Sequence, residues 1–184
     1  MRFEVEIGGR KLVLKRGDIT AEEVDAIVNS ANPELTPGGG VSGAIHRRGG
    51  PAVTEEAARI RRERGRLKTG EAVITTGGNL PAKWVIHTVG PVWHGGKKGE
   101  PELLAKAYRS CLELAKSRSI KTIAFPSIST GVYGYPIDQA AEVALRTVRE
   151  FLEADPGPVE EVHFVLFSEK DFEAYRAAWE RIAG

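Results

Sequence analysis

Hydrophobic and polar residues alternate at the start of the chain and then give way to unbroken hydrophobic runs. Residues 3–7 and 11–15 flank Gly8-Gly9, and this pattern predicts a β-hairpin. Residues 25–29 and 121–126 show no polar alternation, which predicts strands buried on both faces. Further strands are predicted at residues 71–76, 83–89 and 159–167.

Helical periodicity separates these strands. Hydrophobic residues share one face of the segment that Pro136 opens, which predicts a strongly amphipathic helix to about Leu152. Thr20 to Glu23 form a capping-box pattern, which predicts a short helix that starts at Thr20. Other helices are predicted at residues 41–48 (one or two turns), 51–64 and 101–116, and after a capping Ser168.

Strands and helices alternate after the hairpin. This order predicts an α/β protein, a three-layer α/β/α sandwich with a mixed, mostly parallel central sheet, in which the hairpin makes the sheet mixed. A length of 184 residues is most simply one domain, spanning residues 1–184. In such sheets ligands bind beyond the carboxyl ends of the strands.

A Gly-rich loop (residues 29–40) follows the buried strand at 25–29 and leads into the predicted helix at 41–48. It contains Asn29, Asn32 and three consecutive glycines, Gly38 to Gly40. Backbone N–H groups at a helix N-terminus bind anions, so a phosphate-bearing ligand is one interpretation, and a plain surface turn is the other. No Gly-Lys-Ser/Thr follows, which excludes a P-loop.

A second loop (residues 127–135) also leaves the carboxyl end of a buried-type strand and leads into a helix. Two such loops facing one crevice suit a ligand with two phosphates.

The formal net charge of +1 provides no bulk attraction to nucleic acid or to an anionic membrane. Six basic residues crowd residues 59–68, which is either a basic patch or a solvated helix face. Cys111 is the single cysteine and is expected in the core, so neither a disulfide framework nor a thiolate metal site is expected.

The N-terminus lacks the hydrophobic run of a signal peptide, and no segment approaches a membrane span, so we expect a cytoplasmic protein. Charged residues make up 28% of the chain and Asn occurs only three times, a composition that hints at a thermophile.

The motifs, taken together, resemble the macro domain. The resemblance rests on Asn29 to Asn32 with Gly38 to Ile45, and on Ser129 to Gly134. Gly17 to Thr20 and His87 to Pro91 match two further signatures, and the four occur in family order over nearly the whole chain.

The resemblance implies a mixed sheet between helices, ADP-ribose as the ligand, and neither cofactor nor metal. Asp18 and the Ile19 N–H would bind adenine, and Phe167 would pack on it. Asn32 and Tyr133 would contact the distal ribose. The residues implied to line the diphosphate and this ribose are Gly38, Gly39, Gly40, Val41, Ser129, Thr130, Gly131, Val132 and Tyr133.

Each of these roles has a structural alternative. In that alternative Asp18 only caps the helix at Thr20, Tyr133 is a surface turn residue, and Phe167 belongs to the core. The residues expected to be structural are His46, His87 and Asn29, the last through hydrogen bonds to loop backbone.

One residue departs from the hydrolases of the MacroD-like branch, which carry an Asp where this chain has Ser42. Three functions are therefore open. The chain is a slow hydrolase that removes ADP-ribose from acidic side chains of proteins or deacetylates O-acetyl-ADP-ribose, with Asn32 and Ser42 as candidate catalytic residues. Otherwise it is a reader of ADP-ribose without turnover, or, less well supported, an RNA-associated module.

Overall fold

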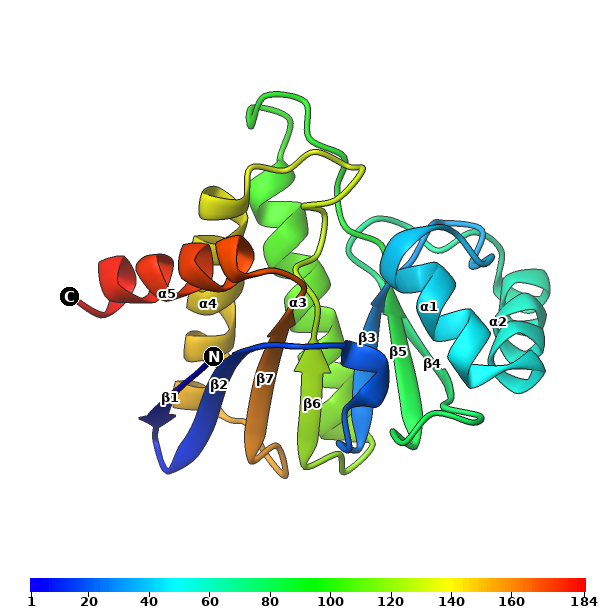
Figure 1. Ribbon diagram of the computed structural model, residues 1–184. Coiled ribbons are helices and arrows are strands. Elements are labelled where there is room, and N and C mark those ends of the chain that lie inside the picture. Colours follow the sequence, from blue (N-terminus) through cyan, green and yellow to red (C-terminus); the bar gives the residue numbers. More distant parts are fainter.

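The computed structural model describes residues 1–184 and contains one seven-stranded sheet with the strand order β1-β2-β7-β6-β3-β5-β4 (Figure 1). The strands are β1 (Arg2–Ile7), β2 (Arg10–Arg16), β3 (Ala26–Ser30), β4 (Ala72–Thr76), β5 (Trp84–Thr88), β6 (Thr122–Phe125) and β7 (Glu161–Leu166). The helices are η1 (Ile19–Ala21, a 3₁₀ turn), α1 (Gly40–Gly49), α2 (Pro51–Arg64), α3 (Glu100–Ser117), α4 (Ile137–Ala154) and α5 (Glu169–Ala183).

Five central strands, from β2 to β5 in the sheet order, run parallel, and both edges are antiparallel. The predicted α/β class and the mixed sheet are confirmed. The hairpin explains only one edge, because β4 also pairs antiparallel with β5. The connection at residues 77–83 is too short for the crossover that a parallel pair needs.

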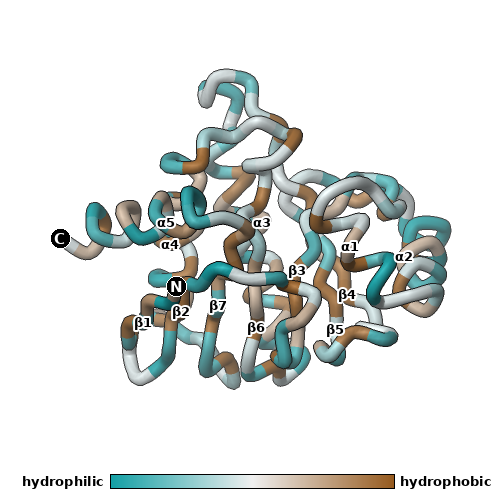
Figure 2. The backbone as a smooth tube through the Cα atoms, in the orientation of Figure 1, coloured by the Kyte–Doolittle hydropathy of each residue, from teal (hydrophilic) through white to brown (hydrophobic).

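Hydrophobic side chains fill both faces of the sheet. The larger cluster joins β2, β7 and β6 to α3, α4 and α5, and it includes Cys111, which is fully buried as predicted. Two smaller clusters lie under η1, α1 and α2. Figure 2 shows this division, with hydrophobic stretches along the central strands and hydrophilic ones along the outer side of α2. No helix is both long enough and apolar enough to cross a bilayer.

Two helix starts differ from the sequence predictions. Thr20 is not an N-cap: it lies inside η1, and the Asp18 side chain caps that turn by accepting a hydrogen bond from the Thr20 N–H. The turn ends after three residues, before Glu23, so the predicted capping box does not form, and the neighbouring Glu22 forms an ion pair with Lys15. Helix α1 is longer than predicted, because ten residues from Gly40 are helical.

Candidate functional site

The Gly-rich loop and the second loop lie at the same edge of the sheet. The first follows β3 and the second follows β6, and these two strands are paired and parallel. Both loops therefore leave carboxyl ends and turn into the N-termini of α1 and α4 (Figure 1). The structure thus brings together the two segments that the sequence predicted to share a crevice.

Backbone N–H groups dominate both loops. None of the N–H groups from Ser129 to Tyr133 donates a hydrogen bond within the chain. The same holds from Gly38 to Ser42, at the uncapped N-terminus of α1. Two runs of free N–H groups, one with a helix dipole behind it, form an anion site that needs no basic side chain.

The glycines of these loops fall into two kinds. A side chain on Gly43 would clash with the Gly38 carbonyl oxygen, so this glycine allows α1 to pack against the loop. A side chain on Gly39 or Gly131 would meet no atom of the chain within 4 Å, and neither residue has a positive φ. Packing and backbone strain explain neither glycine, whereas close approach of a ligand explains both.

Asn32 closes the Gly-rich loop on itself. Its Nδ2 donates to the Thr36 carbonyl oxygen at 3.1 Å, and its Oδ1 accepts from the Thr36 N–H at 3.2 Å. The side chain is half-buried and borders Gly38, whose missing Cβ would lie 3.9 Å from Nδ2. Its contact with the distal ribose stays a prediction.

Beneath this loop lies a row of buried polar side chains. The hydroxyl of Thr75 donates to the Thr76 carbonyl oxygen, so it accepts from His87 Nε2 at 2.9 Å. His87 Nδ1 then accepts from Asn29 Nδ2 at 3.1 Å, and the same Nδ2 lies 3.4 Å from Ser42 Oγ. Burial, followed by the nearby His46, lowers the pKa of His87 to about 3, which keeps the ring neutral.

This row confirms that His87 is a satisfied buried histidine and corrects the expectation for Asn29. The Asn29 side chain bonds other side chains, not loop backbone, because Asn29 lies on β3 directly opposite His87 of β5 and beneath Ser42 of α1. Its Oδ1 is buried without a partner. Ser42 is also buried, at 7% exposure, and receives the Asn29 bond. His46 bonds Thr54 at 2.9 Å, which confirms its structural role.

The predicted adenine end lies where β2 and β7 finish side by side. The Gly17 N–H donates to the Leu166 carbonyl oxygen, which places Asp18 next to Phe167 in space. Phe167 is 85% exposed, so the core alternative is wrong for this residue. An exposed ring beside a carboxylate suits a flat base with an amino group.

Asp18 has two oxygens with different surroundings. Oδ1 accepts hydrogen bonds from the Thr20 N–H and hydroxyl, and Oδ2 lies 3.8 Å from an Arg48 nitrogen. The Thr20 hydrogen bonds, with a smaller contribution from Arg48, hold the pKa of Asp18 below its ordinary value. The carboxylate is therefore ionised at neutral pH, and the capping role does not use Oδ2.

The second loop contains one strained backbone position and an exposed side chain. Ser129 has a φ of +70°, unusual for a residue with a side chain, and its buried hydroxyl has no partner. Val132 is fully exposed, and Tyr133 is half-buried. Thr130 bonds back to Ser127 at 2.9 Å, which holds the loop in shape.

Sequence reasoning missed two residues near the site, Trp93 and Glu100. The Trp93 N–H donates to the Tyr133 carbonyl oxygen at 2.9 Å. Glu100 is buried and accepts hydrogen bonds from three backbone N–H groups of the preceding segment. An acidic residue in the first turn of a helix after a glycine-rich segment was the available signal.

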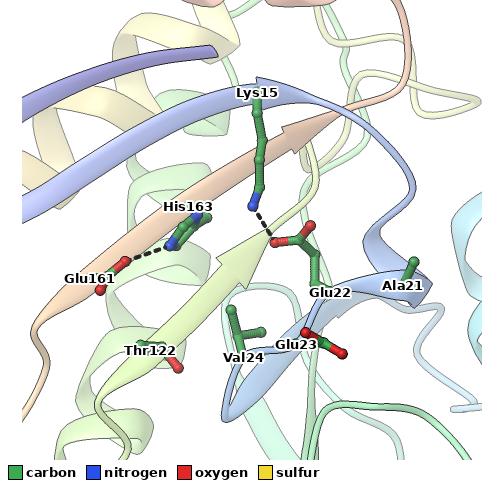
Figure 3. Close-up of a pocket in the computed structure, with 8 residues that line it drawn as sticks. All are labelled: Lys15, Ala21, Glu22, Glu23, Val24, Thr122, Glu161 and His163. Carbon is green, nitrogen blue, oxygen red and sulfur yellow. Dashed lines mark hydrogen bonds and ion pairs between the residues drawn. The ribbon is translucent and has the colours of Figure 1, made fainter. Parts of the chain in front are cut away.

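A separate cavity of about 390 Å³ lies away from these loops, between β2, β6, β7 and the segment after η1 (Figure 3). Its charged groups are only partly matched within the chain, because Glu23 forms no ion pair. Lys15 pairs with Glu22 at 2.6 Å, and Glu161 accepts from His163 at 3.0 Å. The lining therefore carries three carboxylates against one lysine and a histidine, which does not suit an anionic ligand, unlike the free N–H groups of the two loops.

The fold and the loop site together define a macro domain. The macro domain family matches residues 28–144, and the chain belongs to this family. Among solved structures, the chain is similar to a macrodomain of Oceanobacillus iheyensis with ADP. The two share a TM-score of 0.95 and 43% identity, and the match covers 100% of this chain and 97% of that one.

Other relatives carry informative names. The O-acetyl-ADP-ribose deacetylase of Salmonella gallinarum is 56% identical over 165 residues, which cover 90% of this chain and 92% of that protein. A Trypanosoma brucei macrodomain solved in complex with ADP-ribose has a TM-score of 0.83 and 42% identity. That match covers 94% of this chain and 69% of the other.

Proposed function

We propose that residues 1–184 form a single macro domain that binds ADP-ribose across the carboxyl edge of its sheet. The observation that carries the proposal is the pair of facing loops whose N–H groups have no partner in the chain. The diphosphate lies between these loops, adenine lies between Asp18 and Phe167, and the distal ribose lies near Asn32 and Tyr133. The ADP-bound and ADP-ribose-bound relatives support ADP-ribose as the ligand.

We further propose that the bound ligand is an ester of ADP-ribose and that the chain hydrolyses it. The substrates are O-acetyl-ADP-ribose, as the name of the Salmonella relative indicates, and proteins ADP-ribosylated on Glu or Asp. Water attacks the ester carbonyl or the distal ribose carbon, and Asn32 positions the ribose. The Ser42 hydroxyl accepts a hydrogen bond from Asn29 and is no base near neutral pH, so a ligand phosphate oxygen holds the water.

The lack of a carboxylate at position 42 sets the expected rate. A positioned general base contributes about 10²–10⁴-fold, so turnover without one is slow. Hydrolysis is also expected to need no metal, because N–H groups of the backbone hold the diphosphate. Arginine-linked ADP-ribose is not an ester, and we expect no cleavage of that linkage.

The test is single-turnover release of ADP-ribose from a Glu-linked substrate with a chelator present. Asn32→Ala is expected to slow release more than it weakens binding. Ser42→Asp is expected to raise the rate, because it restores a carboxylate beside the water. Full activity in Asn32→Ala would show that Asn32 does not act in the site. If the unmodified chain releases no ADP-ribose over hours, it binds ADP-ribose without hydrolysing it.

A further inference from the structure

The segment from Val92 to Gly99, between β5 and α3, is fixed by a buried carboxylate. Glu100, 1% exposed, accepts hydrogen bonds from the backbone N–H groups of His94 at 2.8 Å, Gly96 at 3.0 Å and Lys98 at 2.6 Å. Although burial opposes it, these backbone bonds lower the pKa of Glu100 to about 2, so the anchor is charged throughout the neutral range.

Trp93 supplies a second anchor for this segment. Its ring lies 4.5 Å from the Tyr135 ring, and its N–H donates to the Tyr133 carbonyl oxygen at 2.9 Å. Gly96, with a φ of +89°, packs beneath the Trp93 ring, where a side chain would come within 2.8 Å of it. The segment is thereby held beside the residue assigned to the distal ribose, and Figure 1 shows it rising next to the second loop.

This fixed segment presents positive charge to solvent. Lys97 and Lys98 are exposed, and neither forms an ion pair with a carboxylate. Exposed Val92 and His94 lie beside them. Ordering three glycines costs conformational entropy, and the two lysine side chains form no ion pair that would offset this cost.

We propose that residues 92–99 form a docking surface for an acidic polypeptide segment that flanks the ADP-ribosylated side chain of a substrate protein. The inference rests on the proposed function, because the linkage to protein leaves from the distal ribose beside Tyr133. Carboxylates next to the modified residue then contact Lys97 and Lys98. Because the segment is already fixed, binding does not carry the entropic cost of ordering it. Free ADP-ribose, which lacks the polypeptide, is expected to bind without the help of these lysines.

The experiment compares two ADP-ribosylated peptides with the same modified Glu, one flanked by Asp residues and one by Asn residues. Affinity is measured by competition, with free ADP-ribose as reference, within a time short enough that the slow hydrolysis releases no significant ADP-ribose. The unmodified chain is expected to bind the acidic peptide roughly three- to tenfold more tightly, and the preference is expected to shrink as salt is raised.

The variant K97E/K98E is expected to lose or reverse this preference while its affinity for free ADP-ribose stays within about twofold. The matched control is K83E/K121E, which makes the same charge change on two exposed, unpaired lysines at the amino ends of β5 and β6. It is expected to keep the preference.

Three outcomes overturn the docking surface. They are equal affinity of the unmodified chain for the two peptides, an unchanged preference in K97E/K98E, and an equal loss of free ADP-ribose binding in that variant. The first leaves the proposed function intact if free ADP-ribose still binds. If the unmodified chain binds no free ADP-ribose, the proposed function itself fails.

Discussion

Gly131 lies in the second loop, where a side chain would point into open space. Gly131→Glu is therefore expected to fold normally and to place a charge and added volume against the diphosphate. Like charges brought together cost several kcal/mol, so ADP-ribose binding is expected to fall drastically with little change in melting temperature. Calorimetry measures the first effect and thermal unfolding the second.

Two further variants separate the causes at this position. Gly131→Gln adds similar volume without charge and is expected to bind better than Gly131→Glu. Gly90→Ala is the contrasting case, because its Cβ would clash with Ser129 Oγ and lie 2.5 Å from Ile128 Cγ2. It is expected to lower the melting temperature. Normal ADP-ribose binding by Gly131→Glu would mean that the second loop does not bind the diphosphate.

Asp18 combines a structural and a proposed binding role, and two substitutions divide them. Asp18→Ala removes both and is expected to weaken ADP-ribose binding by about 1.5–3 kcal/mol, the scale of a hydrogen bond to a charged group. Asp18→Asn keeps a cap for η1 but faces the adenine amino group with another donor. It is expected to weaken binding at an unchanged melting temperature, and unchanged affinity by calorimetry rejects the adenine assignment.

Residues with local signals were predictable, and residues that depend on distant partners were not. Ser168 follows a hydrophobic run and precedes a helix, and its predicted cap is confirmed by a bond from the Asp171 N–H. The partners of Asn29 come from β5 and α1, which are remote in sequence. No local pattern shows that these elements meet beneath the Gly-rich loop.

Strands β3, β4 and β5 bury a neutral histidine, and this predicts a pH dependence of stability. The pKa of His87 is about 3 in the folded chain and about 6.5 for an ordinary histidine. Below pH 6.5 the unfolded chain binds a proton that the folded chain does not. The contribution is therefore complete above about pH 6.5 and is lost as the pH falls towards 3.

Urea unfolding at several pH values between 7 and 4 tests this dependence. In His87→Gln the free energy of unfolding is expected to fall less steeply with pH, whatever its value at pH 7. His94→Gln changes an exposed histidine and is expected to keep the original slope. Parallel slopes for the unmodified chain and His87→Gln would exclude His87 as the source.

Helices that begin at a proline and end at a glycine were predicted closely. Helix α2 has the predicted bounds, since a proline starts it and Gly65 ends it. The short turn at η1 was misplaced because Asp18 and Thr20 are both good caps, and only the chain direction after Ala21 decides between them. The anchoring of residues 92–99 was not predicted, because Glu100 acts through backbone N–H groups and its one sequence signal is an acidic residue in the first turn of a helix.

The order of strands is a property of the whole molecule. Alternating strands and helices predicted the class, but β7 lies between β2 and β6 although it is the last strand in sequence. Long-range pairing of this kind follows from the packing of helices on both faces. The sequence predicted two loops at one edge through the general rule for open sheets, and the strand order places them on adjacent strands.

The distribution of charge over the molecule argues against an RNA-associated module. In the basic segment at residues 59–68, Arg61 and Arg66 both pair with Glu34, at 2.8 and 2.6 Å. Other acids pair with Arg59 and Arg64 in the same way. These contacts support the solvated helix face, because the positive charge is largely matched by neighbouring carboxylates.

We therefore expect weak RNA binding with a shallow salt dependence. Each phosphate contact to a single strand adds about −0.7 to the slope of log K against log salt, so the unmodified chain is expected to show a slope shallower than about −1. Glu34→Gln frees Arg61 and Arg66 and is expected to steepen the slope. Glu153→Gln, which frees one arginine on α4, is the matched control for a lost carboxylate outside this segment. A steep slope in the unmodified chain, unaffected by Glu34→Gln, would show that RNA binds through another surface.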